Sequence, residues 1–342
     1  MKAKAIKKPK DPSFNGRKLS WWLRRLDEDE LSTSEHDAAR AAIGAIGEDA
    51  VPFLLGWLRQ PGRNAFRAAS GFRALGGKAA SAIPEILRDP GPEPQAAGSS
   101  LGGIGLLAIE ALVELLNHSD AMFRSAGAEG LSEIAEPFTD ASLRSCLPPL
   151  VRNTKDVHQH VRARSAWALG TIGREPDTCV PALVPLLHDH SALAQTSAVY
   201  ALGCFGEAGA VALPRLLELL ESGDGPLRSY VVRTIAQFPN EVAWRAVQTS
   251  LGDKDAVVRS AAIKGLSAQP TRAAEVVPML MTILDRAKGN GDKMWAVYSL
   301  GRLGPHASQA LPQLRRLKES GAAGGPEFVE SCILKIEGAA QE

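Results

Sequence analysis

Aromatic residues are scarce in this chain, and neither sign of charge prevails. Only 5% of the residues are aromatic although 45% are hydrophobic, so a core would consist mainly of Ala, Leu, Ile and Val. That composition favours closely packed helices over a β-sandwich rich in Tyr, Phe and Thr. Lys and Arg number 39 against 38 Asp and Glu, so the overall charge does not draw the chain to nucleic acid or to an anionic membrane.

Cysteines and long apolar runs are also few. The cysteines lie far apart without C-x-x-C spacing, which argues against a disulfide framework or zinc ribbon and predicts a reducing, cytoplasmic compartment. No segment reaches the roughly 18 uninterrupted apolar residues of a membrane span. The opening run MKAKAIKKPK lacks the apolar region of a signal peptide, so residues 1–13 are predicted to form a basic, disordered tail. We expect four small, buried, apolar thiols: Cys146, Cys179, Cys204 and Cys332.

An apolar residue followed by proline recurs at a constant spacing. Successive prolines of this kind lie 32 to 34 residues apart, or 64, and such a register indicates an internal repeat. An apolar periodic stretch follows each proline, as in PALVPLLHD and PRLLELLES. This pattern predicts a helix with proline in its first turn, where the missing N–H costs no hydrogen bond. The prolines are Pro52, Pro84, Pro148, Pro181, Pro214, Pro278 and Pro312.

A second helical pattern precedes these prolines and ends in glycine. In VRARSAWALGTIG, Arg162, Leu169 and Gly173 stand at offsets 0, 7 and 11, and the same offsets recur from Gln195 and Lys293. These offsets trace one face of a helix, and the closing glycine suits the left-handed conformation that ends it. The predicted repeat is therefore a Gly-ended helix, a turn, and a Pro-opened helix.

These residues resemble a known repeat. The Arg in the first turn of the Gly-ended helix, its small-Leu-x-x-Ile-Gly ending and the Val-Pro-x-Leu opening that follows are similar to the HEAT repeat, particularly the bacterial type also found in phycobilisome lyases. The stretch FNGRKLSWWLRRL resembles the N-terminal cap of bacterial HEAT-repeat proteins. The resemblance implies an all-α fold, a right-handed armadillo-like α-solenoid of about nine helical hairpins, as a single domain over residues 14–342.

Two stretches depart from the pattern. The third repeat has RDPGPEPQAAGSSLGG where a full Gly-ended helix belongs, and the seventh, around Trp244, lacks the proline. The density of Gly and Pro over residues 89–103 predicts a loop or a stunted helix. A hinge or a recognition loop would lie there, and a tolerated surface irregularity is the alternative.

The sequence offers little support for catalysis. HEAT-like deoxyhypusine hydroxylases hold iron through His-Glu dipeptides, and none of the seven histidines here precedes Glu. HEAT-like DNA glycosylases use a basic concave face, because a phosphate backbone requires charges of one sign. A chromophore-handling protein similar to the phycobilisome lyases is the enzymatic alternative, although no residue set marks a pigment site.

We expect the Pro-opened helices to line a concave side. The third position after the proline is apolar in almost every repeat, as at Leu217. This row is either core or the floor of a groove for an extended or helical peptide. The fourth position carries both signs of charge, which favours a protein over nucleic acid. The candidate partner-binding residues are Phe53, Arg88, Glu114, Arg152, Leu217, Glu218, Met279 and Arg316.

Histidines and arginines recur in the turns. The most metal-like group consists of His158, His160, His188 and His190, but solvated turn histidines are the simpler interpretation, so no metal or cofactor is predicted. Arginines at the starts of Gly-ended helices follow an Asp in the preceding turn, which in HEAT repeats implies a hydrogen-bond ladder between repeats. These arginines are Arg124, Arg162, Arg228 and Arg259, and the aspartates that precede them are Asp120, Asp156, Asp224 and Asp255.

Three aromatic residues occupy one equivalent position of the Gly-ended helices. They are Trp167, Tyr200 and Tyr298, and they are interpreted as repeat packing rather than as a base-stacking platform. The sequence as a whole predicts a non-catalytic, cytoplasmic scaffold that binds a protein or peptide on its concave face. Nucleic-acid binding is a weaker alternative, and no membrane partner is expected.

Overall fold

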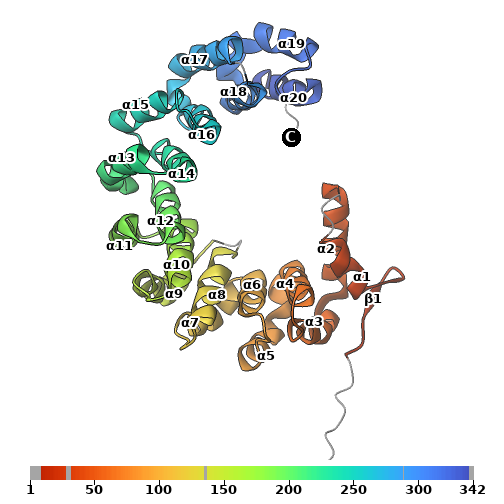
Figure 1. Cartoon of the computed structure of the whole chain (residues 1–342). Coiled ribbons are helices and arrows are strands. Elements are labelled where there is room, and N and C mark those ends of the chain that lie inside the picture. The colour runs from red at the N-terminus through yellow and green to blue at the C-terminus, as the bar shows by residue number, and fades with distance from the viewer. Residues whose placement is uncertain (1–8, 28–31, 135–136, 288, 339–342) are drawn as a thin grey trace, which may run out of the picture. The chain divides into compact units, whose positions relative to one another are not determined.

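The structure is a computed structural model that describes residues 9–27, 32–134, 137–287 and 289–338. Residues 1–8 of the predicted tail lie outside the described residues. The chain divides into two compact units, Met1–Ile172 and Gly173–Glu342, called unit 1 and unit 2 below. Each unit consists of helical hairpins, so the predicted all-α solenoid architecture is confirmed (Figure 1).

Unit 1 opens with a two-stranded hairpin and a short helix. Strand β1 (Ser13–Phe14) pairs antiparallel with β2 (Arg17–Lys18), and α1 (Leu19–Arg25) follows. The Gly-ended helices and their equivalents are α2 (Thr33–Ile46), α4 (Arg63–Leu75), α6 (Pro94–Ile104), α8 (Ala121–Ser132) and α10 (Gln159–Ile172). The Pro-opened helices and their equivalents are α3 (Val51–Leu58), α5 (Ile83–Arg88), α7 (Ile109–Leu116) and α9 (Asp140–Asn153).

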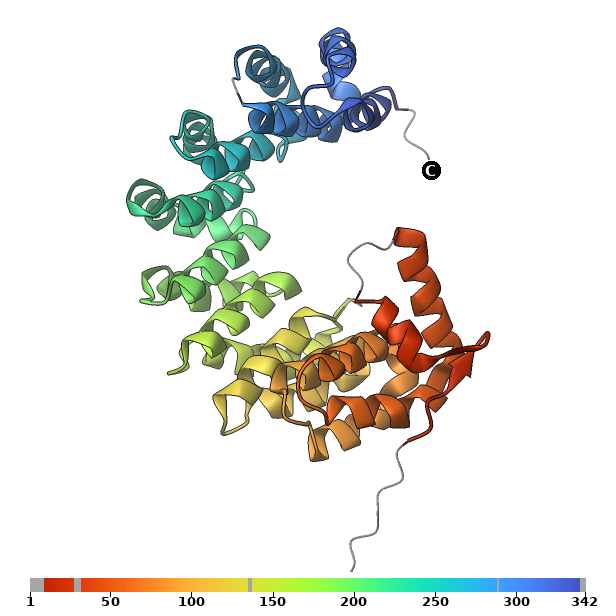
Figure 2. The ribbon, with the colours of Figure 1, turned by 45° about the vertical axis from the view of Figure 1, so that its right-hand side comes forward.

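Unit 2 continues the same alternation, and its hairpins stack one after another in both views (Figure 1, Figure 2). The Gly-ended helices and their equivalents are α12 (Ala192–Cys204), α14 (Gly225–Ile235), α16 (Ala256–Leu266), α18 (Asn290–Leu303) and α20 (Pro326–Ile336). The Pro-opened helices and their equivalents are α11 (Pro176–Leu183), α13 (Leu213–Ser222), α15 (Glu241–Ser250), α17 (Ala273–Arg286) and α19 (Leu311–Glu319). In Figure 1 the first set lies on the inner side of the arc of unit 2, and the second on the outer side. We call them the inner row and the outer row.

Short 3-10 helices connect the two helices of many hairpins. They are η1 (Gly47–Ala50), η2 (Gly76–Ala82), η3 (Leu106–Ala108), η5 (Ala208–Ala212), η6 (Pro270–Arg272) and η7 (Gly304–Ala310). A further 3-10 helix, η4 (Val184–His188), directly follows α11 instead. The predicted closing glycines do adopt positive φ, for example 55° at Gly76 and 56° at Gly304. Glycine enters this conformation without the steric penalty of a Cβ atom, so the turn that the register predicted is confirmed.

The predicted helix faces are buried. Leu169, Leu202 and Leu300, at the offset-7 position, are each 0% exposed, which confirms the register. Three of the four thiols are buried as expected, but Cys204 is exposed at the end of α12, so the prediction was wrong there. Burial raises the pKa of the Cys179 thiol to about 11.

The third repeat contains a complete, buried helix where a loop or stunted helix was predicted. Helix α6 has 11 residues and packs between α4 and α8. A Cβ atom at Gly98 would lie 2.2 Å from the carbonyl oxygen of Ala126, and one at Gly102 would lie 2.3 Å from that of Gly130. Residues 89–93 do form a loop, as predicted, but the prediction was wrong for residues 94–103, because these glycines permit close helix packing instead of breaking the helix.

The residues nearest the N-terminus among those described are packed against the first repeats. The amide of Leu19 donates a hydrogen bond to the Pro12 carbonyl at 2.7 Å, and the Ser20 amide donates to the Asp11 carboxylate at 3.1 Å. A Cβ atom at Gly56 would lie 2.9 Å from the Pro9 ring. Residues 9–13 therefore do not belong to a disordered tail, which corrects the predicted boundary.

One stretch, Thr33–Leu58, has the length and composition of a membrane-spanning helix. In the structure it consists of α2, η1 and α3, and Gly47 at φ 65° interrupts it. The two helices form a hairpin, and residues such as Leu54 and Leu58 are fully buried. A core hairpin accounts for the apolar composition of this stretch.

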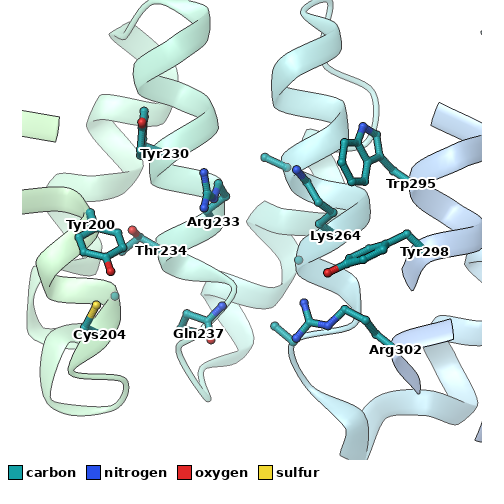
Figure 3. Close-up of a pocket in the computed structure, with 14 residues that line it drawn as sticks. Tyr200, Cys204, Tyr230, Arg233, Thr234, Gln237, Lys264, Trp295, Tyr298 and Arg302 are labelled. Carbon is teal, nitrogen blue, oxygen red and sulfur yellow. The ribbon is translucent and has the colours of Figure 1, made fainter. Parts of the chain in front are cut away.

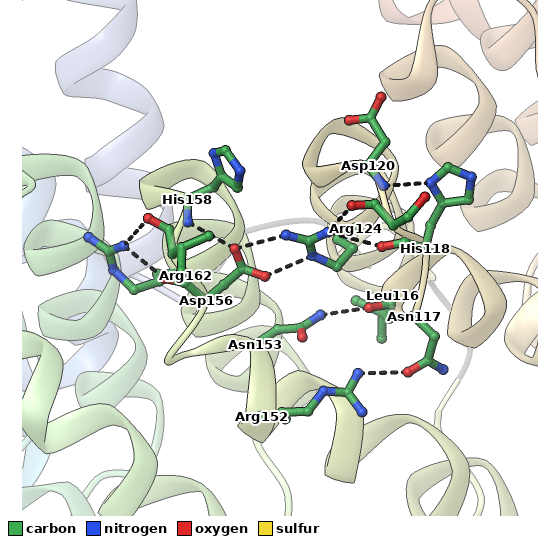
Figure 4. Close-up of polar contacts among 12 residues, drawn as sticks. Leu116, Asn117, His118, Asp120, Arg124, Arg152, Asn153, Asp156, His158 and Arg162 are labelled. Atoms are coloured by element: carbon green, nitrogen blue, oxygen red, sulfur yellow. Dashed lines mark hydrogen bonds and ion pairs between the residues drawn. The ribbon is translucent and has the colours of Figure 1, made fainter.

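The predicted ladder between repeats is confirmed, with a change of partner (Figure 4). Arg124 does not bind Asp120 of its own turn, which instead caps α8 by accepting from the Met122 amide. Arg124 donates to Asp156 of the next repeat at 2.7 and 3.0 Å, and also to the carbonyls of His118 and Ser119. Each rung therefore satisfies turn carbonyls and joins neighbouring repeats with charge-assisted hydrogen bonds.

The same bonds recur in unit 2. Arg228 pairs with Asp253 at 2.9 Å, and Arg259 pairs with Asp292 at 3.0 Å. Because the Arg228 side chain donates to Asp253, it holds the pKa of that carboxyl below its usual value. The arginines of the ladder are thus neutralised locally and do not form a basic stripe.

Candidate functional site

The inner row of unit 2 contains a hollow of about 780 Å³. Helices α12, α14, α16 and α18 line it, and we call it the inner-row pocket (Figure 3). Its walls carry the aromatic side chains Tyr200, Tyr230, Trp295 and Tyr298. They also carry the cationic side chains Arg233, Lys264 and Arg302.

The floor of the inner-row pocket is built from small residues. A Cβ atom at Gly203 would lie 3.2 Å from the Thr234 hydroxyl, and one at Gly265 would lie 2.9 Å from the Ala236 methyl group. Neighbouring inner helices can therefore approach closely while the side chains around them stand above the floor. The Thr234 hydroxyl also donates to the Val199 carbonyl at 2.8 Å, which ties α14 to α12.

A matching hydrogen bond ties the other side of the floor. The Ser299 hydroxyl of α18 donates to the Ile263 carbonyl of α16 at 3.0 Å, and both residues are buried. A buried hydroxyl with a satisfied partner fixes the relative position of the two helices. Side-chain hydrogen bonds between neighbouring helices therefore hold the floor of the pocket in place.

One position of the Gly-ended helix supplies much of the wall. Tyr200, Arg233, Lys264 and Tyr298 each lie two residues before the buried Leu or Ile at offset 7. Successive helical residues are about 100° apart, so this offset-5 position points away from the buried face. Trp167, the equivalent residue of α10, is 36% exposed. Tyr200, Lys264 and Tyr298 are half-buried and Arg233 is exposed, so the interpretation of the aromatic residues as repeat packing stays a prediction.

The aromatic and cationic groups contact one another. The Lys264 ammonium lies 3.9 Å from the centre of the Trp295 ring, and Arg233 lies 5.6 Å from that of Tyr230. Trp295 meets Tyr298 edge to face, with centroids 5.8 Å apart. A cation over a ring face is attracted by the ring quadrupole, so these contacts orient the wall before any ligand arrives.

The positive charges of the pocket are not neutralised. No Asp or Glu lines it, and Arg233, Lys264 and Arg302 have no ion-pair partner within the described part of the chain. Burial lowers the pKa of Lys264, and the nearby charge of Arg233 lowers it further. An anion placed here would relieve this repulsion, in contrast to the ladder arginines, which already have carboxylate partners.

The pocket is suited to binding rather than to covalent chemistry. Its one thiol, Cys204, is exposed on the surface, but partial desolvation by the protein around it raises the thiol pKa above its usual value, which makes it a poorer nucleophile at neutral pH. Over the described ranges, no group of three or more His, Cys, Asp or Glu side chains could hold a metal ion. His158, His160, His188 and His190 are all exposed.

The predicted partner-binding residues lie elsewhere. They belong to the Pro-opened helices and their equivalents, which in unit 2 form the outer row and not the concave side. The expectation that these helices line the inner side came from the resemblance to HEAT solenoids, and it is wrong for unit 2, where they lie on the outer side of the arc (Figure 1). Glu114, Glu218 and Arg316 are exposed, and Leu217 is half-buried.

Several of these side chains have local partners. Arg152 donates to the Asn117 side chain at 2.6 Å, Glu218 accepts from Arg215 at 2.7 Å, and Arg88 pairs with Glu85. Phe53 is 8% exposed and lies against Trp57, whereas Met279 is half-buried. Arg316 borders a smaller hollow of about 250 Å³. The predicted site is therefore a set of dispersed surface residues, and their binding role stays a prediction.

Comparison with known proteins identifies the repeat. Two overlapping segments, residues 147–227 and 213–301, match the family model for HEAT repeats. Residues 147–301 of the chain therefore contain HEAT repeats. No match to a curated protein was found.

Several solved structures are similar to this chain. YibA of Escherichia coli is 18% identical, with a TM-score of 0.49 over 91% of this chain and 99% of that chain. An engineered protein is also 18% identical, with a TM-score of 0.44 over 93% and 98%. Importin beta is 13% identical, with a TM-score of 0.45, and the match covers 93% of this chain and 50% of importin beta.

Proposed function

We propose that this HEAT-repeat protein is a non-catalytic scaffold that binds a segment of a partner protein in the inner-row pocket. The observation that supports this proposal is the combination of four aromatic and three unpaired cationic side chains, without a carboxylate, on hydrogen-bonded helices. Aromatic residues and Arg are enriched at the energetic centres of protein interfaces. A preformed floor also reduces the entropy lost on binding.

The size of the pocket and the placement of its charge favour a polypeptide over nucleic acid. A volume of about 780 Å³ accommodates a few side chains of a bound segment. A nucleic-acid backbone needs a long track of cations, but the offset-5 row changes character along the sequence. In unit 1 the equivalent positions hold Ser99 and Glu129, so the positive charge is confined to the helices of the pocket.

The compartment stays a proposal as well. All four cysteines are free thiols in the structure, which fits the predicted reducing cytoplasm. Fractionation of cells that produce the tagged chain would test this placement.

Selection from an unbiased peptide display library on the full chain would test the binding proposal. Enriched peptides would be re-tested on Trp295→Ala and Tyr298→Ala, with Trp57→Ala in unit 1 as the matched aromatic control. We expect peptides that lose at least tenfold in affinity on the pocket variants and bind the control normally. If no peptide is enriched, or if the enriched peptides bind the pocket variants unchanged, the proposal is wrong whatever the peptide composition.

A further inference from the structure

We infer that the segment bound in the inner-row pocket is extended and acidic, with a carboxylate at every third residue. This inference rests on the proposed function and specifies the partner's chemistry. It is argued from the charges of the pocket, from the separation of its helices and from the donors on its walls.

The charges of the pocket define the sign of the ligand. Arg233, Lys264 and Arg302 come from three successive inner helices, α14, α16 and α18, and no carboxylate accompanies them in the lining. In Figure 3 the side chains of Tyr298 and Arg302 extend from α18 toward α16 and α14. Hydrogen bonds between charged donors and carboxylates are about twice as strong as neutral ones, so acidic side chains are the natural counterpart.

The spacing of the helices defines the spacing of the ligand. Packed neighbouring helices lie about 8–10 Å apart, so cations at equivalent positions, such as Arg233 and Lys264, recur at about that interval. Arg302 lies one turn further along α18, and its side chain extends from there toward α16 (Figure 3). A peptide extended in the polyproline II conformation advances about 3.1 Å per residue with three residues per turn, so every third side chain lies on the same face and is displaced by about the separation of two neighbouring helices. Carboxylates at every third residue would face Arg233, Lys264 and Arg302 in turn.

A helical ligand would need a different pattern. A helix rises about 1.5 Å per residue, so its carboxylates would have to lie about seven residues apart to reach neighbouring pocket helices. The pocket walls favour the extended form, because the amide of Gln237 and the hydroxyl of Tyr298 line it and can bond to the exposed backbone of an extended chain. The aromatic faces of Trp295 and Tyr230 then accommodate the intervening side chains.

Three fluorescent peptides of identical composition would test the spacing. Each has about fifteen residues, with three Glu among Ser and Ala, and the Glu residues lie at every third position, next to one another, or at every seventh position. We expect the every-third peptide to bind the full chain about tenfold more tightly than the other two by fluorescence polarisation. Its affinity should fall as salt is added, because exposed charges are screened.

Charge variants would assign the effect to the pocket. Arg233→Gln and Lys264→Gln should each weaken the every-third peptide about tenfold. Arg286→Gln is the matched control, since Arg286 is exposed at the end of α17 in the outer row, and it should bind normally. Lys264→Gln should fold, because the charged form of Lys264 is disfavoured where it lies, and Arg233 is exposed. Circular dichroism melting would verify folding.

Several outcomes would overturn the inference. Equal affinity for the three peptides would show that the spacing of the carboxylates does not determine binding. Tighter binding of the every-seventh peptide would indicate a helical ligand. Stronger competition by a single-stranded oligonucleotide of similar length would replace a peptide with nucleic acid. If display selection yields pocket-dependent peptides that are basic or apolar, the acidic ligand is wrong although the pocket still binds protein, so the two proposals fail separately.

Discussion

Replacing glycine by alanine should have opposite effects on stability at two helical glycines, because one lies in the close contact between α6 and α8 and the other has open space around it. Gly102 in α6 has no room for a methyl group, since a Cβ atom would lie 2.3 Å from the Gly130 carbonyl oxygen and 2.9 Å from its Cα atom. Gly44 in α2 has room, because the nearest atom to its added Cβ is the Ala74 oxygen at 3.7 Å. Neither glycine has a positive φ.

The magnitudes follow from these distances. In an open helical position, alanine is more stable than glycine by about 0.5–1 kcal/mol, so Gly44→Ala should stabilise unit 1 by that amount. At Gly102 the same gain is opposed by overpacking, which costs about 1–3 kcal/mol. The blocking atoms belong to the backbone and cannot rotate away, so the upper end applies and a net loss of about 2 kcal/mol is expected.

Thermal unfolding would measure both effects. For a unit of this size, 1 kcal/mol shifts the melting temperature by about 2–4 °C, so Gly102→Ala should melt about 4–8 °C below wild type. Gly44→Ala should melt slightly above it. Hydrogen exchange resolved by peptide would locate the loosened region at α6 and α8. If Gly102→Ala is as stable as wild type while Gly44→Ala behaves as expected, the close approach of α6 and α8 is refuted.

Four further expectations concern unit 2. Leu202→Asp places an unpaired charge at a fully buried position and should cost about 3–5 kcal/mol, visible as lost exchange protection in α12 and α14; wild-type protection would contradict the register. Because Arg228 lowers the pKa of Asp253, this pair should stabilise the fold above about pH 4 and lose its contribution as the pH falls through the lowered pKa. Urea titrations at several pH values should therefore find this pH-dependent part of the unfolding free energy in wild type and not in Asp253→Asn. Peptide affinity should decline with rising pH earlier than an ordinary lysine would predict, because the pKa of Lys264 is lowered, and Lys264→Gln should remove that decline. Leu217→Glu on the outer row should fold and still bind pocket peptides. Loss of that binding in a folded variant would indicate that the partner binds the outer row.

Sequence reasoning predicts the repeat well because its signals are local. The closing glycines, the first-turn prolines and the buried leucines each constrain a few neighbouring residues, and the structure confirms them at Gly304, Pro312 and Leu202. The ladder was also predictable in outline. Its true partner, Asp156 rather than Asp120 for Arg124, depends on how two repeats pack and cannot be read from one turn.

Two parts of the structure were beyond that reasoning for physical reasons. Gly98 and Gly102 are weak helix formers in isolation, and only contact with α8 makes their small size favourable. The inner-row pocket draws its side chains from helices about thirty residues apart in sequence, and curvature decides which row faces inward. A signal was nevertheless present, because the offset-5 position carries Tyr, Arg, Lys and Tyr in four successive repeats, at Tyr200, Arg233, Lys264 and Tyr298.

The ladder has a consequence for how such a chain changes in length. Three joints take an arginine from one repeat and an aspartate from the next: Arg124 with Asp156, Arg228 with Asp253 and Arg259 with Asp292. Because these joints use the same two groups in the same order, an in-frame duplication or loss of a repeat that carries both groups leaves the neighbouring joints chemically intact. Such an event would add or remove one side chain at the offset-5 position of the inner row. Specificity could then evolve by copying and editing whole repeats, without redesign of the joints between them.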